Sequence, residues 1–214
     1  QFNLGVAYKK LEDNAKAISC YKKVIEINPN YVEAHNNLGV SFKALGISNK
    51  AIKCYEKAID IDPNYVDAYN NLGVIYHILE ENYKAKKYFE KAIKIDPSFT
   101  HAYWNLQSCS SNLDESLSVL QKLYKIDNTY INAKIMIGAL QGYKGNFDEF
   151  NSILASPHSQ NPYARSVKWV FSLPKLPKLF FNRIDFFDAV IELTEKIRPF
   201  YEFGVWNGIS FKHL

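Results

Sequence analysis

A short segment that recurs every 34 residues constrains the fold of this chain more than any other feature. The sequence Asn-Asn-Leu-Gly-Val occupies residues 36–40 and returns at 70–74, and Asn-Leu-Gly-Val stands at 3–6 in the same register. Other positions keep the same period: the prolines Pro29, Pro63 and Pro97, the alanines Ala17, Ala51 and Ala85, and the aromatic residues Tyr21, Tyr55 and Phe89. A fixed period of this length predicts an array of similar units, each too small to bury its own apolar face.

Each period predicts a pair of antiparallel helices. Leu38 and Phe42 begin an apolar face with helical spacing, Gly46 ends that helix, and Pro63 ends the second one because proline lacks a backbone N–H. A glycine inside a helix costs about 1 kcal/mol relative to alanine, so Gly39 requires a compensating contact. We expect that contact to be a close approach of the two helices at Gly39 and Ala51.

This pattern resembles the tetratricopeptide repeat family. One unit carries the family's positions as Leu38, Gly39, Phe42, Ala51, Tyr55, Ala58 and Pro63, and the next as Leu72, Gly73, Tyr76, Ala85, Phe89, Ala92 and Pro97. The resemblance implies an all-α, right-handed solenoid over residues 1–155. It would comprise a partial repeat 1–29, repeats 30–63 and 64–97, a shortened repeat 98–128 and a degenerate one 129–155. In the shortened repeat Gln107, Ser110 and Ser116 replace family residues, so we expect less regular packing there.

The resemblance also implies that the first helices hold a peptide or protein partner in a concave groove. The candidate residues stand at equivalent repeat positions: Asn3, Asn37, Asn71 and Asn105 in one row, and Lys43 and His77, preceded by Lys9, in another. An amide offers both a donor and an acceptor, so the asparagine row can bracket a peptide backbone. It resembles the asparagine ladder in the repeat arm of O-linked N-acetylglucosamine transferases. The alternative is that asparagine is simply common at this position.

The composition of the chain disfavours several classes of partner and of functional site. Lysine and arginine number 26 against 22 acidic residues, for a net charge of +4, and only three of the basic residues are arginines, which disfavours nucleic acid as a partner. No apolar run is long enough to span a membrane. Three cysteines form no disulfide framework and favour a reducing cytoplasm, and no metal-binding or catalytic set is visible. The mixed charges of the groove residues favour neither an acidic nor a basic ligand.

Residues 156–214 lose the repeat. We expect a capping helix near 163–173 and a proline-containing linker up to 183, followed by the truncated start of an α/β, Rossmann-like unit at 184–214. The segment 201–210 reads Tyr-Glu-Phe-Gly-Val-Trp-Asn-Gly-Ile-Ser and resembles the first motif of S-adenosylmethionine-dependent methyltransferases of the macrocin type. The resemblance implies that Glu202, Gly204 and Gly208 contact that cofactor. Trp206 departs from the motif, and an ordinary strand and turn is the alternative.

Two functions follow for this chain. The first is a protein–protein interaction scaffold that holds a partner in the concave groove. The alternative is a recruitment arm in front of a methyltransferase domain that begins near residue 199 and is cut off at Leu214. On that view the chain itself is no enzyme, because too few residues remain for a doubly wound domain, whereas the full-length protein would be one.

Overall fold

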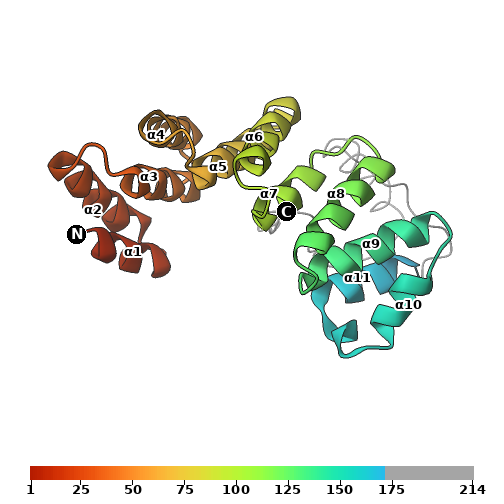
Figure 1. Ribbon diagram of the computed structural model, residues 1–214. Coiled ribbons are helices and arrows are strands. Elements are labelled where there is room, and N and C mark those ends of the chain that lie inside the picture. The colour runs from red at the N-terminus through yellow and green to blue at the C-terminus, as the bar shows by residue number, and fades with distance from the viewer. Residues whose placement is uncertain (172–214) are drawn as a thin grey trace, which may run out of the picture. The chain divides into compact units, whose positions relative to one another are not determined.

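The computed structural model describes residues 1–171, apart from the side chains at positions 166, 169 and 170. All the regular elements of these residues are helices (Figure 1). They are α1 (Phe2–Lys10), α2 (Asn14–Ile27), α3 (Val32–Ala44), α4 (Ser48–Ile61), α5 (Val66–Ile78), α6 (Asn82–Ile95), α7 (Thr100–Gln107), α8 (Leu113–Ile126), α9 (Ile131–Tyr143), α10 (Asp148–Leu154), the 3-10 turn η1 (Pro157–Gln160) and α11 (Pro162–Phe171). The all-α prediction is confirmed for this part of the chain. The predicted Rossmann-like start lies outside the described residues.

The chain divides into two compact units, which meet between Ala102 and Tyr103. In the first unit the helices form three hairpins, α1 with α2, α3 with α4 and α5 with α6. The first helices also contact one another, α1 with α3 and α3 with α5, while α2 packs against both α1 and α3 (Figure 1). The helices α1, α3 and α5 therefore form one layer, and we call its solvent-facing side the first-helix surface.

The ends of the helices follow from local backbone chemistry. Gly46 follows α3 with φ +73°, a left-handed conformation that glycine adopts without a steric penalty. Glu12 and Glu80 occupy the same repeat position with φ 59° and 63°. At the start of α2 the Asp13 side chain accepts a hydrogen bond from the backbone N–H of Lys16. Two of the three hairpin turns thus place a strained glutamate where the middle one has glycine.

In each hairpin of the first unit, a glycine of the first helix packs against an aromatic ring of the second helix. A Cβ built on Gly39 would lie 2.5 Å from Cε1 of Tyr55, and the corresponding distance is 2.4 Å between Gly73 and Phe89. Tyr55 and Phe89 are buried. The close approach at Gly39 was predicted, but Ala51 was the wrong partner, because the ring of Tyr55 occupies the space over the glycine. The small residue makes room for a large side chain.

The second unit is organised around α9, which contacts α8, α10 and α11. The buried Ser116 donates a hydrogen bond of 3.2 Å to Oε1 of the buried Gln107, so two of the three departures from the family pattern form a polar pair with each other. A Cβ on Gly138 would lie 3.1 Å from the backbone nitrogen of Phe150. The helix predicted near 163–173 is present as α11, and its Phe171 packs against the ring of Phe150.

Candidate partner-binding surface

Three of the four predicted asparagines belong to the first unit. Asn3 on α1 is exposed, and Asn37 on α3 and Asn71 on α5 are partly buried. Since α1, α3 and α5 are neighbours in one layer, the three side chains stand on consecutive helices of that layer. Asn105 lies on α7 in the second unit.

The side chain of Asn37 is hydrogen-bonded to the preceding repeat. Its Oδ1 accepts a hydrogen bond of 3.2 Å from Nζ of Lys9, across 28 residues of sequence. The donor lies in the last turn of α1, and the acceptor lies near the middle of α3. This bond uses the acceptor of the Asn37 amide, and among the described residues its Nδ2 group has no acceptor.

Asn71 makes the complementary contact. Its Nδ2 donates a hydrogen bond of 2.9 Å to Oδ1 of Asn36, which is buried at 7% exposure. The donor of Asn71 is thus used, and its own Oδ1 is left without a described partner. Asn36 was not among the predicted site residues. The signal that could have found it is the doubled asparagine, which stands at both 36–37 and 70–71.

The second predicted row contains Lys43 and His77, which have different surroundings. Lys43 is partly buried in the last turn of α3, and burial lowers the pKa of its ammonium group, helped by the positive charge of Lys9. His77 lies at the end of α5, and its Nδ1 is 2.9 Å from Oδ1 of Asn82 at the start of α6. His77 is therefore anchored within its own hairpin.

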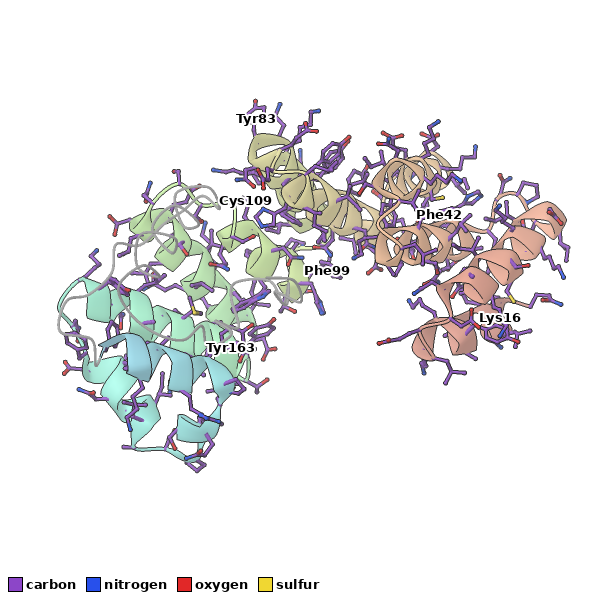
Figure 2. All side chains as sticks on the ribbon, turned by 180° about the vertical axis from the view of Figure 1, so that it is seen from behind. Lys16, Phe42, Tyr83, Phe99, Cys109 and Tyr163 are labelled. Carbon is purple, nitrogen blue, oxygen red and sulfur yellow. The ribbon has the colours of Figure 1, made fainter. Side chains whose placement is uncertain are left out.

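Sequence reasoning missed a third periodic feature, a lysine that lies against an aromatic ring of the first helix in every hairpin of the first unit. Nζ of Lys16 is 5.3 Å from the centroid of Tyr8, that of Lys50 is 5.5 Å from Phe42, and that of Lys84 is 5.1 Å from Tyr76. Lys16 and Phe42 are labelled in Figure 2. Cation–π contacts at exposed sites contribute about 0.5–1 kcal/mol each. The 34-residue spacing of these lysines was the available signal.

The described residues contain no group of three histidine, cysteine or acidic side chains that could hold a metal ion. The cysteines Cys20, Cys54 and Cys109 are free thiols, and burial raises the pKa of Cys54 to about 11, which disfavours the reactive thiolate. None of the helices between residues 1 and 171 is long and apolar enough to cross a membrane. The polar side chains of the first unit can therefore contact a partner through hydrogen bonds and ionic interactions.

Comparison with known proteins identifies the repeats. Residues 5–46 and 48–79 match a family model described as TPR repeat, and residues 66–99 match the tetratricopeptide repeat model. Residues 5–99 thus match tetratricopeptide repeats over nearly their whole length. The helix pairs α1–α2, α3–α4 and α5–α6 fall almost entirely within the matched residues, so the family prediction is confirmed for this part of the chain.

Solved structures of repeat proteins resemble the chain. The structure of MamA is 26% identical, with a TM-score of 0.60, and the match covers 77% of this chain and 94% of MamA. A MamA structure from Desulfovibrio magneticus is 18% identical with a TM-score of 0.62, covering 74% and 94% of the two chains. YrrB, a tetratricopeptide repeat protein with an unusual peptide-binding site, is 20% identical with a TM-score of 0.59, covering 78% and 90%. No curated protein matches the chain significantly.

The methyltransferase-like residues Glu202, Gly204 and Gly208 lie outside the described residues. The family matches end at residue 99. The motif resemblance at 201–210, and the S-adenosylmethionine site that it implies, therefore stay predictions.

Proposed function

We propose that the first-helix surface binds an extended peptide segment of a partner protein. Tetratricopeptide repeats mediate protein–protein interactions, and the first helices of this chain place polar side chains at one repeat position. The proposal rests on the side-chain amides of Asn37 and Asn71, which have opposite hydrogen-bonding groups available to a partner. Within residues 1–171, Nδ2 of Asn37 has no acceptor and Oδ1 of Asn71 has no donor, whereas the other half of each amide is fixed by a bond between repeats.

A free donor and a free acceptor on neighbouring helices match the two polar groups of a peptide backbone. Nδ2 of Asn37 would donate to a peptide carbonyl, and Oδ1 of Asn71 would accept from a peptide N–H. The bonds to Lys9 and Asn36 hold both amides in place before the partner arrives, which lowers the entropic cost of binding. Such contacts recognise the backbone and leave sequence preference to neighbouring side chains. Asn3 on α1 would extend the same recognition within the first unit.

The test is a selection of random dodecapeptides, displayed on phage, against the full 214-residue chain. Enriched peptides would be synthesised with an amidated C-terminus and titrated against the wild type and Asn37→Ala. We expect about tenfold weaker binding by the variant, the loss of roughly one well-oriented hydrogen bond. Asn49→Ala is the matched control, because Asn49 is an exposed asparagine on α4. Equal loss in both variants, or no loss in Asn37→Ala, would refute the proposal.

A second proposal concerns residues 184–214 and rests on the motif at 201–210 alone. We infer that the repeats act as the recruitment arm of a methyltransferase whose cofactor site begins at Glu202, Gly204 and Gly208. The measurement is S-adenosylmethionine binding by the product of the whole gene, followed by calorimetry, with Gly204→Val as the variant. Binding that survives this substitution would contradict the assignment of the site.

A further inference from the structure

The helix α6 carries a large excess of positive charge. Its 14 residues include five lysines and one glutamate, Glu90, so their net charge of +4 equals that of the whole 214-residue chain. The equivalent helices of the other hairpins are closer to neutral, because α2 contains three lysines and one acidic residue and α4 contains three lysines and two acidic residues. The excess is therefore local to α6 and does not come from the repeat pattern.

Four of the five lysines follow one face of α6. They stand three, four and three residues apart, the spacing that makes side chains neighbours on a helix surface: Lys84, Lys87, Lys91 and Lys94. We call this row the lysine stripe, and at about 1.5 Å per residue it is about 15 Å long. All four side chains are exposed. Because α6 is the second helix of its hairpin, the stripe does not belong to the first-helix surface.

Most of the stripe has no negative charge beside it. Glu81 forms an ion pair with Lys84, whereas the other three lysines of the stripe have no ion-pair partner within residues 1–171. An aromatic ring lies beside one of them instead, since Nζ of Lys87 is 4.5 Å from the centroid of Tyr83. A ring has no net charge, so this contact orients the ammonium group and leaves its charge available to an external anion.

The aromatic residue at the stripe is itself exposed. Tyr83, at the start of α6 and labelled in Figure 2, is 73% exposed. Tyrosine has an apolar body and a polar tip, and it is enriched where the headgroups of a membrane meet the acyl chains. A row of lysines with an exposed tyrosine in contact with it is therefore a combination that suits a membrane surface.

We propose that the lysine stripe and Tyr83 dock the protein peripherally on an anionic phospholipid surface. Lipid headgroups present diffuse negative charge, which ammonium groups on flexible stems follow without a fixed geometry. Nucleic-acid recognition favours arginine, and residues 1–102 contain none. An acidic polypeptide would also attract the lysines, but it has no apolar layer for the Tyr83 ring. Glu90 opposes the attraction with one negative charge against four positive ones.

The experiment measures sedimentation of the full chain with vesicles of phosphatidylcholine that contain about 30% phosphatidylserine, in about 0.1 M salt. The stripe variant replaces its three unpaired lysines: Lys87→Gln, Lys91→Gln and Lys94→Gln. The matched control replaces three exposed lysines of α2 and α4 and has the same net charge: Lys22→Gln, Lys53→Gln and Lys57→Gln. Circular dichroism would verify that both variants keep their helices.

We expect the stripe variant to bind the vesicles about 100-fold more weakly, because each lysine near an anionic surface changes partitioning about fivefold. The control should lose only a few-fold. Tyr83→Ser should also weaken binding although the charge is unchanged, and vesicles of phosphatidylcholine alone should bind none of the proteins.

Three results would overturn this inference. Equal losses in the stripe variant and the control would show that the net charge of the chain, rather than the stripe, attracts it to vesicles. Absence of vesicle binding by the wild type would exclude the membrane altogether. Tighter binding to duplex DNA or to polyglutamate than to the vesicles, at the same salt concentration, would assign the stripe to a different class of partner.

Discussion

The ring of Tyr55 lies so close to the backbone of Gly39 that a methyl group on the glycine would come within 2.5 Å of Cε1. The ring is buried, and in the part of the chain that the structure describes its hydroxyl has no hydrogen-bond partner. The same contact recurs between Gly5 and Tyr21, where the distance is 2.7 Å. One glycine and one aromatic ring thus set the distance between the helices of each hairpin.

Gly39→Ala is expected to destabilise the protein by about 1–3 kcal/mol, because the overpacking at Tyr55 outweighs the roughly 1 kcal/mol gained in helix propensity. Urea unfolding followed by circular dichroism measures the change. In a Tyr55→Leu background, where the ring is absent, the same substitution should cost much less. An equal cost in both backgrounds would show that the ring is not the obstacle.

Tyr55→Phe is expected to leave the stability unchanged or to raise it by up to about 1 kcal/mol, since the buried hydroxyl has no partner among the described residues. The third hairpin already has phenylalanine at this position, Phe89. Denaturant midpoints of the wild type and the variant decide the matter. Destabilisation by more than 1 kcal/mol would mean that the hydroxyl makes a favourable interaction in solution.

Because of the same buried hydroxyl, the stability of the protein should depend on pH in the alkaline range. Burial raises the pKa of Tyr55 above its ordinary value of 10.0, so the folded state keeps the proton where the unfolded chain releases it. This contribution to the free energy of unfolding is fully present below pH 10 and is lost as the pH rises above 10. Between pH 9 and pH 11 the free energy of unfolding should therefore fall more steeply for the wild type than for Tyr55→Phe. Parallel curves would contradict the assignment.

Glu12→Gly is expected to stabilise the first hairpin by about 1 kcal/mol, because Glu12 holds a left-handed φ of 59° that glycine adopts freely. The reciprocal change, Gly46→Ala, should destabilise by a similar amount. A Cβ at Gly46 would meet no atom within 4 Å, so backbone strain is the only cost there. Thermal unfolding of both variants should give shifts of opposite sign.

Lys43→Met is expected to raise the free energy of unfolding by about 1 kcal/mol, because it removes a partly buried cation that has no ion-pair partner within residues 1–171 and keeps the apolar stem. Lys57→Met, at an exposed site on α4, should change it by less than about 0.5 kcal/mol. Urea unfolding of the two variants gives the comparison. A destabilised Lys43→Met would indicate that the lysine is a structural residue.

The sequence predicted the helix pairs well because the residues that end helices act locally. Gly46 ends α3 through its own backbone conformation, and α4 ends at Ile61, two residues before Pro63. The 34-residue period then assigned residues to equivalent positions on successive helices. Those features need no knowledge of how one hairpin packs on the next.

The contacts between repeats were not predictable in the same way. Whether Lys9 reaches Asn37, or Asn71 reaches Asn36, depends on the rotation between hairpins, which a single period does not encode. The ring over Gly39 was missed for a related reason, since spacing alone does not distinguish Tyr55 from Ala51 as the nearest neighbour. The period of the sequence predicts on which face of a helix a residue lies, whereas the contacts between hairpins depend on how the hairpins pack in three dimensions.

The bonds Lys9–Asn37 and Asn71–Asn36 each cross from one hairpin to the next. In a stacked array each hairpin packs chiefly on its neighbours, and these two bonds add polar contacts between successive hairpins. The amides that we propose as partner contacts thus also link neighbouring hairpins of the first unit. Under the proposed function, a bound segment would contact side chains that already join two hairpins, so peptide binding and the stability of the array would be linked.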